Sequence, residues 1–340
     1  MTRDIAVCIL NDTRIDRHHG CERVMGALES LVAGQGLRIS ATCPAHVDWR
    51  QDAAFLRALD AARLVIVNGE GTLHHDRPEA RILLEIGRHS RARGVPAVLV
   101  NAGWESNGPE LCALARDFVL VSARDRRSAE ELRAHGVDCR VVPDLSLYEP
   151  IAVPAASAAS GLPAFTDSVD RFAAIALERC RREVGGTTLS IMFPDAGIGG
   201  YLKFLRAGFA ARDVARPAAF MRIVRMRHRL WRAASPRTAE FIAQLARASL
   251  LVSGRFHACT LALLTRTPFV ALPSNTGKIA QLVADAGLDG WRNQAELTPR
   301  FMAEASRRGW SAREEASIAD YVATMRLAAQ SLFRDVRALA

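Results

Sequence analysis

An arginine and a histidine stand two positions apart, directly after an apolar run of the sequence. Ser253 and Gly254 end this run, and Arg255 and His257 come directly after them. A guanidinium holds a carboxylate or a phosphate through two parallel hydrogen bonds, and an imidazole exchanges protons near neutral pH. A helix that begins here adds free backbone amides and its positive dipole end. We therefore predict that Ser253 and Arg255 bind an acidic substrate and that His257 donates a proton to it.

The geometry of a regular helix restricts this pair. Residues two positions apart point about 200° away from each other, so Arg255 and His257 face one ligand only if the first turn is irregular. A structural role for His257, in which the ring caps a helix or packs inside the domain, is the alternative. Its position after a predicted strand favours the catalytic role.

Polar and glycine-rich clusters follow most of the other apolar runs. Glu70 stands between two glycines, where a carboxylate gains little from packing, so we predict that it acts as a base. The residues predicted to contact substrate are Asn11, His18, Gly69, Gly71, Thr72, Arg124, Asp125, Asp144, Asn275 and Lys278. Turns also need glycine, asparagine and aspartate. Arg124 and Asp125 fit an ion pair or a helix cap equally well, and Asp144 fits a turn equally well.

Two histidine pairs, His18 with His19 and His74 with His75, raise the question of a metal site. Zinc ligands usually follow spacings such as CxxC or HxxxH, whereas adjacent histidines point apart on most backbones. We therefore expect no metal here. Hydrogen bonding to a substrate is the expected use of these side chains.

The apolar runs themselves are short and bounded by turn residues, which is typical of buried strands. The predicted strands are Ile5 to Leu10, Leu37 to Thr42, Arg63 to Val67, Ala97 to Val100, Phe118 to Val121, Cys139 to Val142, Thr187 to Phe193, Phe220 to Val224, Leu250 to Val252 and Phe269 to Leu272. Segments with helical periodicity lie between most of them. This alternation predicts an α/β fold with mostly parallel sheets.

The length and an internal change of composition predict two domains. The 340 residues suit two domains of ordinary size, and the stretch from Glu149 to Ser168 is rich in alanine, proline and serine. The predicted division is an N-terminal α/β domain over 1–150, a linker with a connecting helix over 151–185, a C-terminal α/β domain over 186–311 and a closing helix over 312–340. We expect two Rossmann-like open-sheet domains that face each other across a cleft, a GT-B-like arrangement. Ligands of open α/β sheets bind beyond the carboxyl ends of the strands, where the polar clusters fall.

The chain is strongly basic, with a formal net charge of +9 and a sequence pI near 9.8. This charge favours anionic partners, among them an anionic membrane surface. A dense basic group at Arg222, Arg225, Arg227, Arg229 and Arg232 suits a phosphate or such a surface, and the lack of interleaved aromatic residues argues against nucleic acid.

Location and redox state are also predictable. No apolar run approaches the ~20 residues that cross a bilayer, and the first residues do not read as a signal peptide, so we expect a cytoplasmic protein with peripheral contact at the inner membrane face. Seven scattered cysteines without CxxC spacing indicate reduced core thiols.

Two motifs of this chain resemble those of the polysaccharide pyruvyl transferase family. The run from Arg124-Asp125 through Ser128, Leu132 and Gly136 to Pro143-Asp144 is similar to the family's R-D-x-x-S, L-x-x-x-G and P-D core. Ser253-Gly254-Arg255-Phe256-His257, with Lys278 further on, is similar to its R-hydrophobic-H element and its lysine. The resemblance spans roughly residues 5 to 290. After the first strand the chain departs from the family, because His18 to Cys21 replaces a Gly-Asp pair.

Members of this family move a pyruvyl group from phosphoenolpyruvate onto two hydroxyls of a hexose, as a cyclic ketal. The resemblance implies that phosphoenolpyruvate is the donor substrate, that Arg255 and Lys278 hold it with His257 as the acid, and that no cofactor is needed. It also implies a glycan or lipid-linked sugar as the acceptor, near Glu70 and His18. Two alternatives remain open: a GT-B-type glycosyltransferase with a nucleotide-sugar donor, and a non-catalytic anion- or glycan-binding protein.

Overall fold

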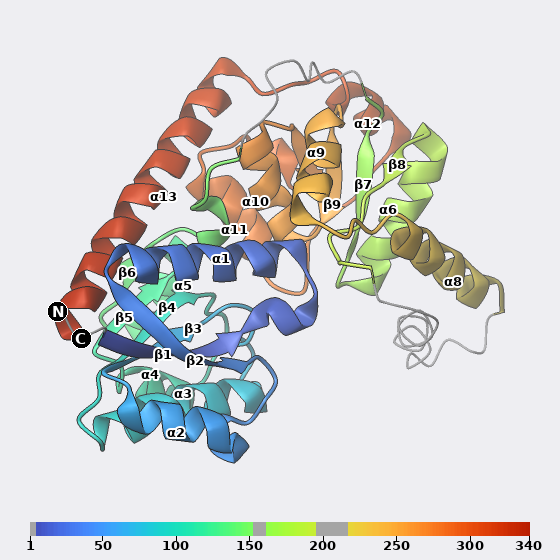
Figure 1. Cartoon of the computed structure of the whole chain (residues 1–340). Coiled ribbons are helices and arrows are strands. Elements are labelled where there is room, and N and C mark those ends of the chain that lie inside the picture. Colours follow the sequence, from blue (N-terminus) through green and yellow to red (C-terminus); the bar gives the residue numbers. More distant parts are fainter. Residues whose placement is uncertain (1–4, 152–160, 195–216) are drawn as a thin grey trace. The chain divides into compact units, whose positions relative to one another are not determined.

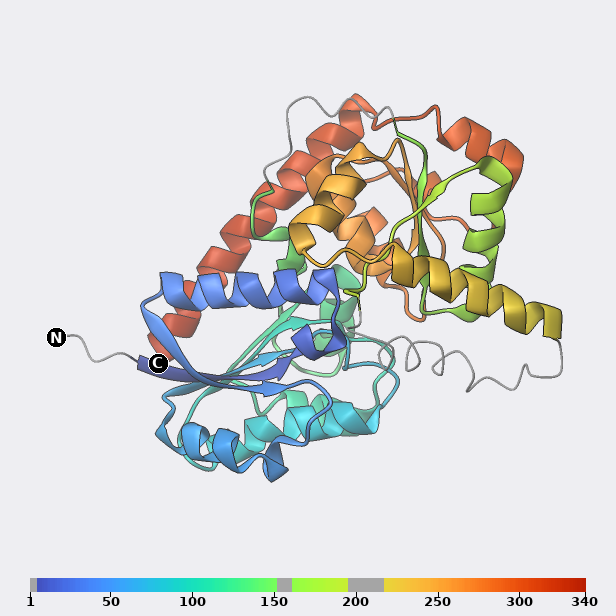
Figure 2. The same ribbon diagram turned by 45° about the vertical axis from the view of Figure 1, so that its right-hand side comes forward.

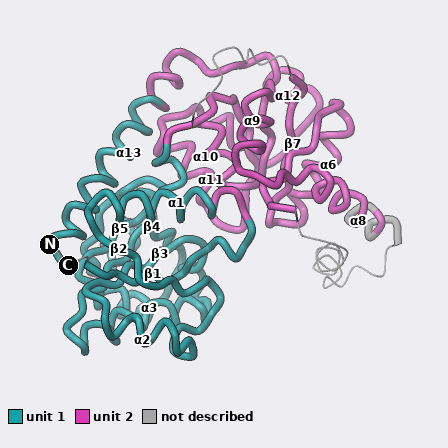
Figure 3. The backbone as a smooth tube through the Cα atoms, viewed as in Figure 1, with its two compact units in different colours: residues 1–17, 21–149, 319–340 teal, residues 18–20, 150–318 magenta. Residues whose placement is uncertain are grey.

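The computed structural model describes residues 5–151, 161–194 and 217–340, and within the last range the side chains of 217–220, 222 and 223 are not described. The chain divides into two compact units (Figure 3). Unit 1 comprises residues 1–17, 21–149 and 319–340, and unit 2 comprises 18–20 and 150–318. Each unit has its own parallel sheet.

Unit 1 is built on a six-stranded sheet with the order β2-β1-β3-β4-β5-β6. The strands are β1 (Ile5–Asp12), β2 (Leu37–Pro44), β3 (Leu64–Asn68), β4 (Ala97–Ala102), β5 (Leu120–Ala123) and β6 (Arg140–Val141). All neighbouring pairs are parallel, and β3 and β4 are buried along their whole length, as expected for apolar strands covered on both faces. The order reverses between β1 and β3, so their carboxyl ends form the switch point of this sheet.

Helices cover both faces of this sheet, with α1 on one face and α2 and α3 on the other (Figures 1 and 2). The helices are α1 (His19–Gly34), α2 (Ala53–Ala61), α3 (Pro78–Arg91), α4 (Pro109–Ala115) and α5 (Arg126–Ala134), with short 3₁₀ turns η1 (Thr13–Asp16), η2 (Trp49–Gln51) and η3 (Leu145–Leu147). Asp52 caps α2, and prolines open α3 and α4, where their fixed φ suits the first helical position.

Unit 2 contains a four-stranded parallel sheet with the order β10-β9-β7-β8. Its strands are β7 (Ala164–Ser168), β8 (Thr187–Thr188), β9 (Leu251–Gly254) and β10 (Phe269–Ala271). Its helices are α6 (Arg171–Val184), α8 (Pro217–Arg232), α9 (Thr238–Arg247), α10 (Phe256–Thr265), α11 (Lys278–Asp285), the 3₁₀ turn η5 (Gly290–Arg292) and α12 (Pro299–Ala305). Helix α13 (Ala312–Leu339) begins in unit 2 and ends in unit 1, and it matches the predicted closing helix.

The α/β class with parallel sheets is as predicted, but two expected elements are wrong. The segment from Phe220 to Val224, predicted as a strand, lies in helix α8. Its two apolar ends are four positions apart, which is helical spacing as well. The stretch 151–185, predicted as a linker with one helix, contains strand β7, which pairs with both β8 and β9. Residues 152–160 of that stretch lie outside the described residues.

All seven cysteines are buried and none forms a disulfide, as predicted for core thiols. Among the described helices, none combines the length and hydropathy that a membrane crossing requires.

Candidate functional site

The switch point of the unit 2 sheet lies between β7 and β9, where the strand order reverses. Ser253 at the end of β9 shares a hydrogen bond of 2.7 Å with Thr166 in β7. A Cβ on Gly254 would lie 2.4 Å from the Cβ of Ser168, so only glycine allows the two strand ends to approach this closely. The turn at Arg255, which follows at once, is thereby held against β7.

Arg255 is the cap residue before α10 and has extended backbone angles, φ −114° and ψ 118°. Because it lies outside the helix, the regular spacing that would turn it away from His257 does not apply. Its guanidinium donates to Asp167 twice, from Nε to Oδ1 at 2.7 Å and from Nη2 to Oδ2 at 2.5 Å. This side-on ion pair fixes the guanidinium and leaves its Nη1–Nη2 edge for a second acceptor.

His257, in the first turn of α10, is buried and lies beside His18. The two ring centroids are 5.2 Å apart in an edge-to-face arrangement. The backbone amide of Gly20 donates to Nδ1 of His18 at 3.0 Å, so a neutral His18 carries its proton on Nε2. The pair therefore presents one N–H donor of fixed orientation next to a second imidazole.

His18 was predicted on the N-terminal side of the molecule, but its contacts place it in unit 2. It forms an antiparallel bridge with Met192, and the amide of His19 donates to the carbonyl of Ile191 at 3.0 Å. These backbone contacts join residues 18–20 to the segment after β8, a link that sequence proximity to the first strand does not indicate.

The surroundings of His18 are positively charged. Its pKa is lowered well below the ordinary value, mainly by burial and further by nearby ionisable groups, which are His257, Arg255, His19 and Lys278. Lys278 begins α11 after Gly277, and its ammonium donates to Oδ1 of Asn275 at 3.3 Å. Unit 2 therefore gathers two cations, Arg255 and Lys278, near the imidazoles of His18 and His257, and we call these four side chains the cation cluster. Such a cluster suits a ligand with more than one negative charge.

Glu70, the predicted base, lies in unit 1 with its carboxylate buried and 4% of the residue exposed. Thr13 donates to Oε2 at 2.6 Å, and the thiol of Cys21 donates to Oε1 at 3.1 Å. These bonds tie the ends of β1 and β3 together. In this arrangement the carboxylate is buried and holds internal hydrogen bonds, which accounts for the residue without a substrate contact.

The other residues after β1 and β3 shape the same turn. Asn11 donates from Nδ2 to the carbonyls of Asn68, at 2.6 Å, and of Glu70, at 3.2 Å. A Cβ on Gly69 would lie 2.6 Å from Cα of Ala102, and Gly71 has φ +74°, so both glycines are required by the backbone. Thr72 donates to the Glu70 carbonyl at 3.3 Å.

The Arg-Asp and Pro-Asp motif residues form a buried network in unit 1. Arg124 lies 3.5 Å from Asp144 between Nη1 and Oδ2, and the two residues are 7% and 1% exposed. Asp125 caps α5 by accepting the amide of Ser128 at 2.7 Å, and Asp144 caps η3 through Ser146. An ion pair and two helix caps therefore account for the contacts of Arg124, Asp125 and Asp144 given above. This is the structural alternative that the sequence left open for them.

The remaining candidates are distributed between the units. His74 and His75 lie in unit 1, with their Nδ1 atoms 2.9 Å apart, whereas His18 and His19 belong to unit 2, so neither unit holds all four. In the basic group on α8, Arg229 pairs with Glu178. Burial lowers the pKa of Arg227, and the nearby charges of Asp167 and Arg255 act on it in opposite directions. The side chain of Arg222 lies outside the described ones.

Comparison with known proteins agrees with the motifs. A model of the polysaccharide pyruvyl transferase family matches residues 36–276, which is more than two thirds of the chain. The chain belongs to the polysaccharide pyruvyl transferase family. No curated protein sequence matches it.

Solved structures share the fold of this family member. UDP-GlcNAc 2-epimerase from Neisseria meningitidis, bound to UDP-GlcNAc, is 9% identical with a TM-score of 0.50, over 97% of this chain and 99% of that one. UDP-N-acetylglucosamine 2-epimerase from Rickettsia bellii is 10% identical with a TM-score of 0.50, over 97% and 98%. At this level of identity the likeness shows the fold alone.

The family match does not cover the whole cation cluster of this pyruvyl transferase family member. It includes Arg255 and His257, begins after His18 and ends two residues before Lys278. Asp167, the partner of Arg255, was not predicted. In the sequence Asp167 stands near the end of the short segment Ala164–Ser168, which follows an alanine- and proline-rich stretch. Its position near a strand end is the only indication of its role that the sequence offers.

Gly20 determines where the His257 ring can lie. A Cβ on Gly20 would be 2.2 Å from Cγ and 2.4 Å from Nδ1 of that ring, whereas a Cβ on Gly26, in the same helix, meets nothing within 4 Å. We predict that Gly20→Ala lowers the free energy of unfolding by about 1–3 kcal/mol through this overlap. Gly26→Ala is the control and should raise it by about 0.5–1 kcal/mol. Urea unfolding of both variants tests this, and equal effects would contradict it.

His19 is completely buried and serves the packing of unit 2. Its ring stacks on Phe241 at 4.8 Å and meets Phe193 edge-on at 4.1 Å, while Nδ1 lies 3.1 Å from the Thr238 hydroxyl. Burial lowers the pKa of His19 to about 4. The unfolded chain therefore binds a proton on this ring at a higher pH than the folded one.

This difference makes stability depend on pH in a defined window. The stability that His19 contributes is complete above pH ~6.5 and is lost as the pH falls toward ~4, which amounts to about 2 kcal/mol between pH 7.5 and 5. We expect His19→Phe to remove this part of the slope. The measurement is the free energy of unfolding of the wild-type protein and of His19→Phe at pH 7.5 and 5. An equal change of this free energy in both proteins would contradict the prediction.

Proposed function

We propose that this protein transfers a pyruvyl group from phosphoenolpyruvate onto two hydroxyls of a hexose in a glycan. Membership of the family supports a transferase acting on polysaccharide. The observation that carries the choice of donor is the cation cluster at the switch point of the unit 2 sheet. Phosphoenolpyruvate bears a phosphate ester and a carboxylate on the same carbon, C2, which is the charge pattern that such a cluster complements.

Each member of the cluster has a distinct part in holding the donor. The Nη1–Nη2 edge of Arg255 pairs with one anionic group, and Asp167 keeps the guanidinium oriented for it. Lys278 supplies a compact charge for the other group, with Asn275 beside it. His18 stays neutral because its pKa is lowered, and it donates a hydrogen bond from Nε2.

The reaction consumes one donor and one diol and releases inorganic phosphate. One sugar hydroxyl adds to C2 of phosphoenolpyruvate and loses its proton, while C3 gains a proton and becomes a methyl group. The second hydroxyl then displaces phosphate from C2 and loses its own proton, which closes the ketal. We assign the proton transfer to C3 to His257, because its ring lies beside His18 in the cation cluster and imidazole is the side chain best suited to exchange a proton near neutral pH.

The acceptor in this proposal is a hexose of a polymer or of a lipid-linked precursor. Unit 1 would hold it, at the carboxyl edge of its own sheet. A net charge of +9 suits an acceptor that is carried on an anionic lipid surface.

A panel of donors tests the proposal by thermal shift, since a ligand that binds only the folded state raises the melting temperature. Phosphoenolpyruvate is expected to raise it, and UDP-sugars are expected to have little effect. His257→Asn should keep the phosphoenolpyruvate shift but lose phosphate release in the presence of glycan acceptor, by about 10²–10⁴-fold. A shift with UDP-sugars alone would instead indicate a glycosyltransferase, and phosphate release that survives in His257→Asn would remove the assigned acid.

A further inference from the structure

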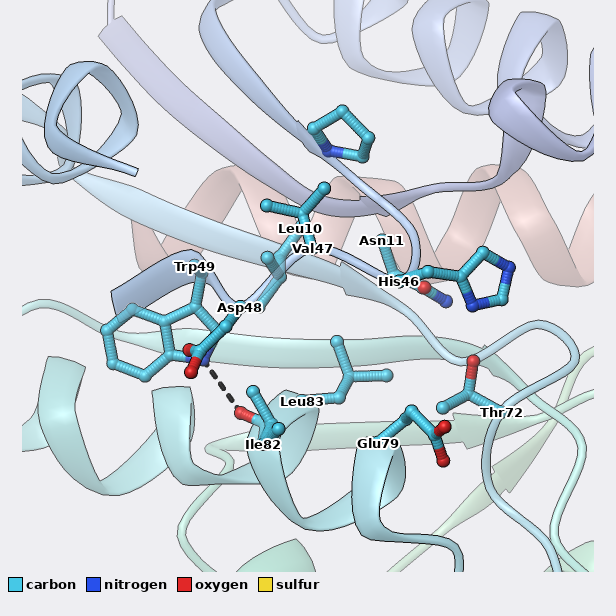
Figure 4. A pocket seen from close by; sticks show the side chains of 11 residues that line it. Leu10, Asn11, His46, Val47, Asp48, Trp49, Thr72, Glu79, Ile82 and Leu83 are labelled. Carbon is cyan, nitrogen blue, oxygen red and sulfur yellow. Dashed lines mark hydrogen bonds between the residues drawn. The ribbon is translucent and has the colours of Figure 1, made fainter. Parts of the chain in front are cut away.

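Unit 1 has a pocket of its own at the carboxyl edge of its sheet, with a volume of about 120 Å³ (Figure 4). Its walls come from the ends of β1 and β2, the loop after β3 and the first turns of α3. These elements surround the point where the strand order reverses between β1 and β3. Ligands of open α/β sheets bind at this place, so the pocket has the position of a binding site.

The pocket combines an apolar floor with oxygen acceptors. Leu10 and Leu83 are buried beneath it, and Val47 is 41% exposed at its edge. Figure 4 shows Thr72 and Glu79 on the same side of the pocket as Asn11 and His46. This division between apolar and polar walls is typical of small-molecule sites.

The polar groups favour a ligand that donates hydrogen bonds. The Nδ2 of Asn11 is committed to two backbone carbonyls, so its Oδ1 is the end left for a ligand. The hydroxyl of Thr72 donates to the Glu70 carbonyl and can still accept. Glu79 and Asp48 add carboxylates, and the described residues that line the pocket include no lysine or arginine. An anion is disfavoured here, in contrast to the cation cluster of unit 2.

We infer that this pocket binds the uncharged pyranose ring of a glycan, with the apolar C–H face of the ring on Leu83 and Val47 and its hydroxyls donating to Asn11, Thr72 and Glu79. A pyranose presents this combination of one apolar face and a rim of hydroxyl donors. The inference names the acceptor subsite and its substrate class, and it rests on the proposed function only for calling that sugar the acceptor.

Saturation-transfer NMR with methyl glycosides of glucose, galactose, mannose and N-acetylglucosamine tests the site on the full chain. Glu79→Gln removes the carboxylate charge and should weaken binding of the preferred glycoside about tenfold, since hydrogen bonds to charged groups exceed neutral ones by about this much. Leu83→Trp fills the pocket and should abolish the signal. If Leu83→Trp does not fold, the Glu79 comparison decides alone.

Glu110→Gln is the matched control. Glu79 and Glu110 each lie in the first turn of a helix that begins with proline, each is exposed and each pairs with a neighbouring arginine, but only Glu79 lines the pocket. The inference is overturned if none of the glycosides binds the wild-type protein. It is also overturned if Glu79→Gln and Glu110→Gln bind the glycoside with the same affinity. The phosphoenolpyruvate shift, measured on the same samples, is expected to stay unchanged in all three variants. If phosphoenolpyruvate gives no thermal shift with the wild-type protein, the proposed donor is refuted. The sugar pocket is then tested by the NMR result alone.

Discussion

Replacing Lys278 with methionine is expected to weaken binding of phosphoenolpyruvate about a hundredfold. Lys278 lies in the cation cluster, where its charge lowers the pKa of His18, and it begins helix α11. Removing one partner of a partly buried charge pair typically costs about 2–5 kcal/mol, and 1.4 kcal/mol corresponds to a factor of ten. Methionine keeps most of the side-chain volume, so the change removes the charge with little effect on packing.

The control for this substitution is Arg266→Met, which also removes one positive charge from unit 2. Arg266 lies at the opposite end of α10 and is exposed, with Nη1 donating to the carbonyl of Glu315 at 3.1 Å. Isothermal titration with phosphoenolpyruvate should give nearly the wild-type Kd for Arg266→Met. If the two variants lose the same affinity, the donor responds to net charge and not to a site at Lys278.

The largest effect on stability is expected at Arg292 in η5. Its guanidinium is fully buried and donates to Glu314 at 2.5 and 2.7 Å, as well as to the carbonyls of Phe269 and Gly309. Two indole rings sandwich it, at 4.5 Å for Trp291 and 3.9 Å for Trp310. Arg292→Met leaves the buried carboxylate unpaired and should lower the free energy of unfolding by about 3–5 kcal/mol.

A second substitution separates the loss of the pair from the loss of the arginine. In Arg292→Met combined with Glu314→Leu the unpaired charge is gone, so part of the stability should return, although the hydrogen bonds from Ser311 and Asp289 to Glu314 are lost as well. Chemical denaturation of the two single variants and the double variant gives this comparison. A double variant as unstable as Arg292→Met would show that packing around the guanidinium, and not the buried charge, determines the cost.

The same pair predicts a response to acid. Burial raises the pKa of Glu314, but hydrogen bonds from Arg292, Ser311 and Asp289 outweigh it and bring the pKa to about 2. A carboxyl with a lowered pKa stabilises the folded state above its unfolded value of 4.5, and this contribution is lost as the pH falls from there toward 2. The wild-type protein should therefore lose stability in this range more steeply than the double variant.

The strands and the strand-end clusters could be predicted because both follow from local sequence. Apolar runs such as Leu64–Asn68 are buried on both faces, and the residues after them stand at one edge of a parallel sheet. Strand β7 was missed because Ala164–Ser168 contains two hydroxyl residues and an aspartate and follows a stretch that reads as a linker. Asp167, which holds Arg255, lies in this same strand and for that reason was not predicted either.

Long-range contacts explain the other differences. His18 follows the first strand in the sequence, yet backbone pairing with Met192 places it in unit 2 beside His257. Glu70 reads as an accessible carboxylate between glycines, but Thr13 and Cys21 bury it. Spacing along the sequence indicates none of these contacts, because each one depends on how separate segments meet in the folded chain.

Protection of Lys278 from acylation tests the central claim, binding of phosphoenolpyruvate at the cation cluster, most directly. The sequence has lysine only at 203 and 278, and Lys203 lies outside the described residues. Mass spectrometry of trace-acetylated protein therefore measures the acetylation rate of Lys278 relative to that of Lys203. At ten times the Kd, phosphoenolpyruvate should slow acetylation of Lys278 about tenfold by simple occupancy and leave Lys203 unchanged. Equal reactivity of Lys278 with and without phosphoenolpyruvate, or protection by UDP-sugars instead, would contradict the account.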